Sequence, residues 1–155
     1  MYKVLHFFNF GENIIKWIRL FYSNIVFCVT VNGHLSDWFN VCRGVRQGDP
    51  FSPYLFILCV EILSILIRQN KNISGIMINN IEYLVSQYSD DTTVLLDGTE
   101  RSLRNTLTVF NRYASISGLH INIDKTKGSL INSQHSICQY LGITFEFDDF
   151  LFVRS

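Results

Sequence analysis

Apolar and polar positions alternate with a helical period in the segment that follows Gly11. Lys16 and Arg19 mark its polar side. The apolar side carries Ile14, Trp17, Ile18 and Phe21. A repeat of three to four residues is typical of a helix with one buried face, so we expect an amphipathic helix here that buries those four residues.

A second pattern predicts strands. Residues 25–31 are mostly β-branched or aromatic, Asn32 and Gly33 supply the two positive-φ positions of a type I′ turn, and residues 34–41 return as the second arm of a hairpin. Further short strands are expected at 76–78, 81–88 and 92–96.

Two longer segments predict helices. Ser52 can cap the first and Pro53 can occupy its first turn; the segment runs to about Arg68 and is apolar nearly all round, so it should be central and packed on several sides. Thr99 can cap the second, which should end at Gly118. The apolar face of this second helix carries Leu103, Leu107, Phe110 and Ala114.

The C-terminal part indicates more strands. Residues 119–127 and 127–132 are typical of strand, turn and strand, and residues 138–153 alternate around Gly142 as a β-ribbon. No internal repeat, low-complexity tract or linker divides the chain. We therefore expect one unit of the α+β class.

Composition supports a folded protein. Hydrophobic residues make up 48% of the 155 residues and aromatic residues 14%, which excludes a disordered chain. Thirteen basic and thirteen acidic residues cancel, so a nucleic-acid site must rest on local patches.

The most apolar segment, 54–67, contains Glu61 and is shorter than the roughly 20 residues of a membrane span, so no membrane partner is expected. Four widely spaced cysteines favour reduced thiols and an intracellular protein.

The acid pair Asp90-Asp91 is the most informative polar feature, and the strand pattern places it with Ser89 at a hairpin tip. Two adjacent carboxylates repel, and no lysine or arginine occurs between Asn72 and Glu100. Carboxylate oxygens on a tight turn suit Mg²⁺ or Mn²⁺, so a divalent-metal site is one interpretation. An ordinary solvated turn is the other, because aspartate is common in turns.

A basic loop precedes the first long helix. It contains Arg43, Arg46 and two glycines, which allow backbone N–H groups and guanidiniums to approach a phosphate closely. A basic surface turn without a ligand is the alternative interpretation.

Four segments together resemble the reverse transcriptases of non-LTR (LINE-type) retrotransposons. GVRQGDPFSPYLFILCVEIL is similar to the family's motif B, QYSDDTTVLLDG to the YxDD-type motif C, SGLHINIDKTK to motif D and QYLGITF to motif E. The resemblance covers most of the chain and implies part of a right-hand polymerase palm with part of the fingers. Residues 1–52 would hold a fingers/palm helix, the hairpin and the motif B loop, and residues 53–155 the palm with motifs C, D and E.

The resemblance also implies residue roles. Asp90 would be the main metal-binding aspartate, with Asp91 beside it and Tyr88 near the primer end. The loop that would hold the incoming nucleotide and template consists of Arg46, Gln47, Gly48, Asp49 and Pro50. Lys125 would approach the triphosphate, with Lys127 as the alternative. The primer grip would consist of Tyr140, Leu141 and Gly142.

The resemblance implies RNA-templated DNA synthesis with two Mg²⁺ or Mn²⁺ ions as cofactors. The implied partners are an RNA template, a DNA primer and dNTP. The implied location is a ribonucleoprotein of the nucleus or cytoplasm. The motif A aspartate has no match, because the only acids before Asp49 are Glu12 and Asp37 and neither lies in a strand-like run. The thumb that would follow motif E is also missing. We therefore expect weak or no polymerase activity from this chain alone. The alternative is a non-catalytic, degenerate retroelement fragment that is at most a nucleic-acid-binding module.

Overall fold

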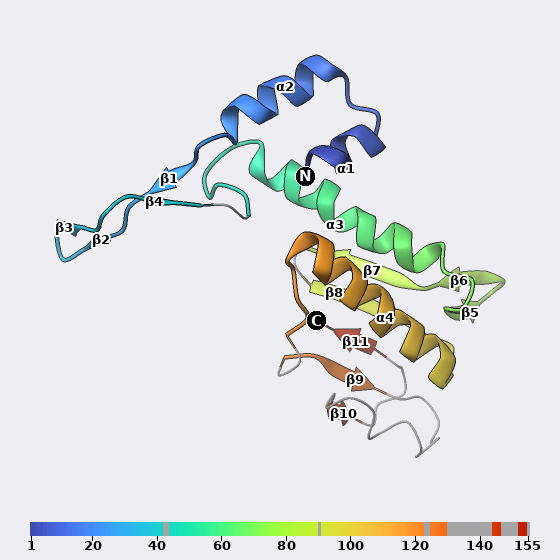
Figure 1. Cartoon of the computed structure of the whole chain (residues 1–155). Helices are drawn as coiled ribbons and strands as arrows, with labels where there is room; N and C mark the ends of the chain where they lie inside the picture. The colour runs from blue at the N-terminus through green and yellow to red at the C-terminus, as the bar shows by residue number, and fades with distance from the viewer. Residues whose placement is uncertain (42–43, 90, 123–124, 130–143, 147–151, 155) are drawn as a thin grey trace. The chain divides into compact units, whose positions relative to one another are not determined.

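The structure, a computed structural model, describes residues 1–41, 44–89, 91–122, 125–129, 144–146 and 152–154. The chain divides into two compact units, Met1–Val60 and Glu61–Ser155, and each has its own hydrophobic core. Helices are combined with small, mostly antiparallel sheets, which confirms the α+β class (Figure 1). None of the helices in these ranges is long and apolar enough to cross a membrane.

Three helical segments form the core of Met1–Val60. They are α1 (Tyr2–Phe7), α2 (Glu12–Phe21) and the first part of α3 (Ser52–Arg68). The buried residues of this core are Leu5, Ile15, Ile18 and Leu55. Helix α1 is not anticipated by the sequence pattern, since its 6 residues are too few to show a period.

The expected buried face of α2 is wrong in part. Ile18 is buried as expected, but its partner in the core is Ile15, whereas Ile14, Trp17 and Phe21 are 49%, 60% and 43% exposed. The helix carries apolar residues on two neighbouring faces, and either one fits a period of 3.6 residues. Packing against Leu5 decides between them, and that contact is not visible in the local sequence.

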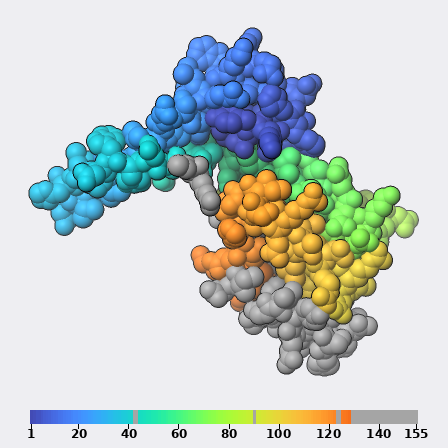
Figure 2. Space-filling model, in the orientation of Figure 1, coloured from blue at the N-terminus to red at the C-terminus, as the bar shows by residue number. Residues whose placement is uncertain are grey.

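A four-strand ribbon follows α2. It consists of β1 (Val26–Phe27), β2 (Thr30–Val31), β3 (His34–Leu35) and β4 (Phe39–Asn40), with β1 paired to β4 and β2 to β3. Val31 pairs with His34, and the turn residues Asn32 and Gly33 have φ of 50° and 82°, which confirms the type I′ hairpin. Figure 2 shows the ribbon as a narrow projection from the helices of the same unit.

The larger sheet of Glu61–Ser155 has the strand order β10-β9-β11-β8-β7. Its strands are β7 (Val85–Tyr88), β8 (Asp91–Leu95), β9 (Lys127–Ser129), β10 (Thr144–Glu146) and β11 (Phe152–Arg154). The strands β5 (Ile76–Ile78) and β6 (Ile81–Tyr83) form a separate hairpin, whose turn residues Asn79 and Asn80 both have positive φ.

The C-terminal part of α3 and the whole of α4 (Glu100–Ser117) pack on β8. The core residues that they share are Leu63, Ile67, Val94, Leu96, Leu103, Val109, Phe110 and Tyr113. The expected face of α4 is confirmed, because Leu103, Phe110 and Ala114 are buried and Leu107 packs against the core. In Figure 1, α4 lies across the strands that it covers.

Several strand predictions need correction. The segment 81–88 is interrupted at Leu84 between β6 and β7. Residues 119–122 are not a strand, although the turn expected after Asn122 is present: the N–H groups of Lys125 and Thr126 donate to the carbonyl of Asn122. Strand β10 pairs in parallel with β9, and β11 pairs with β8 and β9, so the last two strands do not form a ribbon with each other. Gly142 lies outside the described residues.

Thr99→Ala is expected to destabilise the unit Glu61–Ser155 by about 1 kcal/mol, the usual cost of losing a helix cap. The Thr99 hydroxyl accepts the N–H of Ser102 at 3.2 Å, and Gly118 ends the helix with φ of 76°. Urea unfolding followed by circular dichroism measures the change. Thr108→Ala is the control, because Thr108 is exposed in the middle of α4, where alanine is a better helix former. An equal loss in both variants would remove the capping explanation.

Candidate functional site

The acid pair lies where β7 turns into β8. Tyr88 pairs with Asp91 and Gln87 with Thr92, and Ser89 has φ of 55°, so the turn is tight. Asp91 is the first residue of β8 and is half-buried, which corrects its expected place at the tip. Tyr88 is 84% exposed, so its ring is open to a ligand. Asp90 lies outside the described residues.

The side-chain amide of Gln87 links this hairpin to α3. The hydroxyl of Ser64, which is buried on α3, donates to Gln87 Oε1. Gln87 Nε2 in turn donates to Thr92 Oγ1 at 3.3 Å, next to Asp91. Sequence reasoning does not single out Gln87 or Ser64, because their pairing joins positions 23 residues apart. Both residues hold the carboxylate-bearing end of β8 in place.

Asp91 offers hard oxygen donors of the kind that Mg²⁺ and Mn²⁺ prefer. Among the described residues, no three or more histidine, cysteine, aspartate or glutamate side chains come together as a metal-binding group. The two acids before Asp49 lie elsewhere: Glu12 is in the first turn of α2, with its carboxylate 3.6 Å from His6 Nδ1, and Asp37 is exposed between β3 and β4. Neither acid lies on a strand.

The loop before α3 (residues 44–51) has a defined backbone path. Arg46 to Asp49 form a turn in which the Asp49 N–H donates to the Arg46 carbonyl at 3.4 Å, and Gly48 takes φ of 85°, a conformation that glycine adopts without strain. Gln47, Gly48 and Pro50 are exposed, whereas Arg46 and Asp49 are half-buried. The exposed part of the turn is therefore available to a ligand.

The carboxylate of Asp49 faces its own loop. Asp49 Oδ1 accepts the N–H of Phe51 at 2.9 Å. This bond, followed by the hydroxyl of Tyr22 and the charge of Arg46, lowers the pKa of Asp49 below its usual value. The side chain is thus ionised at neutral pH and acts as a backbone acceptor. The helix begins at Ser52 itself, so Ser52 is not the residue before the helix that the sequence predicts.

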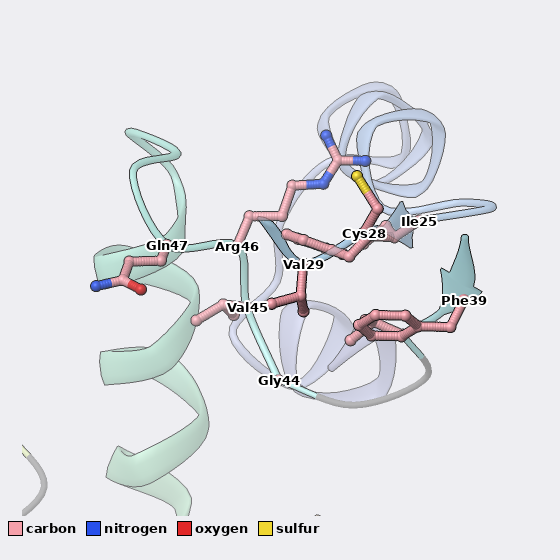
Figure 3. Close-up of a pocket in the computed structure, with 10 residues that line it drawn as sticks. Ile25, Cys28, Val29, Phe39, Gly44, Val45, Arg46 and Gln47 are labelled. Atoms are coloured by element: carbon pink, nitrogen blue, oxygen red, sulfur yellow. The ribbon is translucent and has the colours of Figure 1, made fainter. Parts of the chain in front are cut away.

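A pocket of about 290 Å³ lies between this loop and the base of the ribbon, all within Met1–Val60. Its lining residues are Ile25, Phe27, Cys28, Val29, Phe39, Val41, Gly44, Val45, Arg46 and Gln47. Figure 3 shows Arg46 extending toward the side of Cys28, whereas Gln47 extends away from the ribbon. The walls are apolar, and Arg46 and Gln47 supply the polar groups.

Lys125 is exposed on the turn that follows α4. Its N–H donates to the carbonyl of Asn122 at 3.1 Å, and the neighbouring Thr126 is 2% exposed and anchors the turn. Lys127, the alternative, lies in β9. The loop before α3 belongs to Met1–Val60, and Tyr88, Asp91 and Lys125 belong to Glu61–Ser155. The expected primer grip, Tyr140, Leu141 and Gly142, lies outside the described residues.

Comparison with known proteins gives a consistent result. Residues 1–145 match the family model described as reverse transcriptase (RNA-dependent DNA polymerase). The chain is 29% identical over 125 residues to a retrovirus-related Pol polyprotein of a type-2 retrotransposable element from Drosophila melanogaster, covering 81% of this chain and 11% of that protein. It is 25% identical over 163 residues to an uncharacterized 149 kDa protein of transposon TX1 from Xenopus laevis, covering 94% of this chain and 12% of that protein.

A shorter match joins the chain to a plant protein. An uncharacterized mitochondrial protein of Arabidopsis thaliana is 43% identical over 70 residues, covering 41% of this chain and 56% of that protein. The chain thus spans less than two thirds of the length of each of these relatives. The family model nevertheless covers nearly all of the chain, and the retroelement relatives match most of it. The chain therefore belongs to the reverse transcriptase family, of the non-LTR retrotransposon type.

Proposed function

We propose that the chain supplies the nucleotide-binding loop and part of the metal site of an RNA-directed DNA polymerase palm. The observation that supports this most directly is the tight β7–β8 turn, which places Asp91 at the start of β8, a strand anchored in the core by the buried residues Thr92 and Val94. Asp90 and Asp91 would hold Mg²⁺ or Mn²⁺. Arg46 to Pro50 would contact the incoming nucleotide and the template.

The carboxylate, guanidinium and amide groups of these residues suit the binding of metal ions and phosphates. When bound, two divalent ions would stabilise the charge on the attacking and leaving oxygens of phosphoryl transfer. Arg46 and the loop amides would hold the nucleotide phosphates, and Lys125 would approach the triphosphate. Tyr140, Leu141 and Gly142 would support the primer strand, with Tyr88 near its end. The partners would be an RNA template, a DNA primer and dNTP, in a nuclear or cytoplasmic ribonucleoprotein.

The proposed domain layout follows the motif order. Residues 1–52 would contribute fingers and a palm helix, and residues 53–155 the remainder of the palm. A second candidate function is a nucleic-acid-binding module without catalysis. It is favoured by the positions of Glu12 and Asp37, since neither can serve as a strand-borne third metal ligand.

Mn²⁺ binding by the purified chain tests the metal site. Asp90→Asn keeps the size of the side chain and removes its charge, so the affinity measured from the electron paramagnetic resonance signal of unbound Mn²⁺ should fall by at least about 10-fold. Asp37→Asn is the control, because it removes one exposed charge in the other unit and should leave the affinity unchanged. Equal affinities in wild type and Asp90→Asn would favour a merely solvated turn.

A further inference from the structure

Tyr22, the residue that follows α2, contacts the loop before α3 at its far end. The hydroxyls of Tyr22 and Ser52 are hydrogen-bonded at 2.7 Å, and either one can donate. Ser52 is only 5% exposed, so its hydroxyl has little access to water. Removing the Tyr22 hydroxyl would leave a buried polar group poorly satisfied, which is more costly than the loss of an exposed bond.

The ring of Tyr22 contacts the near end of the same loop. The guanidinium carbon of Arg46 lies 5.9 Å from the ring centroid, within the range of a cation–π interaction. One side chain therefore touches both Arg46 and Ser52, which enclose the exposed turn. Tyr22 is itself held in place, because its N–H closes α2 on the carbonyl of Ile18 at 3.0 Å and its ring packs against the core of the unit.

The charges around Tyr22 favour this arrangement at neutral pH. Burial raises the pKa of the Tyr22 phenol above its usual value, so the hydroxyl stays protonated. The ionised Asp49 carboxylate lies near the same hydroxyl and near Arg46. Tyr22 thus joins a cation, an anion and a buried hydroxyl, all on the loop or at its junction with α3.

We propose that Tyr22 is a positioning residue for this loop: its hydroxyl fixes the junction at Ser52 and its ring fixes Arg46, so that Arg46 and Gln47 meet nucleotide phosphates in one arrangement. The anchoring of the loop stands on the contacts alone. The consequence for nucleotide phosphates rests on the proposed function.

Hydrogen–deuterium exchange of the full chain tests the anchoring. Tyr22→Phe removes only the hydroxyl, and the exchange of the Asp49, Phe51 and Ser52 amides should become about 3- to 10-fold faster, the effect expected from one hydrogen bond. Ser52→Ala should produce a similar change. Amide exchange in the double variant should be little faster than in either single variant, because both substitutions remove the same hydrogen bond.

Tyr54→Phe is the matched control. Tyr54 is 68% exposed on α3, within the same unit, and its variant should leave loop exchange unchanged. Unchanged loop exchange in Tyr22→Phe would overturn the proposal. So would faster exchange throughout α1 and α2 to the same extent as in the loop, because Tyr22 would then be a packing residue only.

A binding measurement separates this inference from the proposed function. The affinity of the chain for dATP with Mg²⁺, measured by calorimetry, should fall about 3- to 10-fold in Tyr22→Phe and stay unchanged in Tyr54→Phe. If the wild-type chain binds no dATP while loop exchange responds as expected, the nucleotide-binding role fails and the anchor is supported. If dATP binds equally well to wild type and Tyr22→Phe, the positioning role is overturned.

Discussion

Replacing Ile67 with alanine is expected to lower the free energy of unfolding by about 2–5 kcal/mol. Ile67 is 0% exposed in α3 and belongs to the core that also contains Val94 of β8 and Phe110 of α4. The substitution removes buried apolar groups and leaves a cavity between two helices and a strand. Because small domains are stable by only about 5–15 kcal/mol, the loss is a large fraction of the total. Urea unfolding followed by circular dichroism measures it.

The same helix offers a matched control. Ile57→Ala makes the same chemical change at a position that is 59% exposed. The free energy of unfolding should therefore change by no more than about 0.5 kcal/mol. A similar loss in both variants would show that exposure in this structure does not identify the core. The test also concerns the candidate site, because β8, which begins at Asp91, is held by this core through Val94.

The elements predicted best from the sequence are those specified by neighbouring residues. Asn32 and Gly33 adopt the positive φ that a type I′ turn requires, and Thr99 and Gly118 cap the two ends of α4 as expected. Each of these signals acts over four residues or fewer, so the local sequence contains the whole cause.

Features that depend on distant partners were not predictable in this way. The buried face of α2 depends on packing with Leu5, and the hydrogen bond between Ser64 and the hairpin residue Gln87 joins positions 23 residues apart. The order of β9, β10 and β11 is likewise set by pairing between segments far apart in the chain. Hydrophobic periodicity says that a face is buried but not which partner buries it.

The residues of the candidate site show the same contrast between local motifs and distant contacts. The motifs single out Asp91, Tyr88, Lys125 and the residues from Arg46 to Pro50. In the structure these residues lie at strand ends, on a turn or in the loop before α3, and their roles stay predictions. Tyr22 carries no motif signal in the sequence. Its importance emerges only from its contacts with Ser52 and Arg46, 30 and 24 positions further along the chain.

Primer extension on an RNA template is expected to be no faster with this chain than with its Asp90→Ala variant. Two-metal transfer needs enough carboxylate ligands to hold both ions, which stabilise the attacking and leaving oxygens. The resemblance places the third of these carboxylates on a strand before the motif B loop. The only two acids before this loop do not lie on a strand: Glu12 is in the first turn of α2 beside His6, and Asp37 is exposed between β3 and β4. Loss of one group that stabilises transition-state charge typically costs about 100- to 1,000-fold in rate.

The measurement is extension of a labelled DNA primer annealed to RNA, with the chain in excess over primer and with Mg²⁺ or Mn²⁺. Asp37→Asn serves as the control for a general effect of removing charge. Rapid extension that Asp90→Ala abolishes would contradict the prediction, and it would mean that another residue of this chain completes the metal site. Mn²⁺ binding that depends on Asp90, without extension, would instead show that the acid pair binds metal but does not support catalysis in this chain. Extension restored by a strand-borne aspartate, supplied by protein engineering, would then identify the third carboxylate as the missing group.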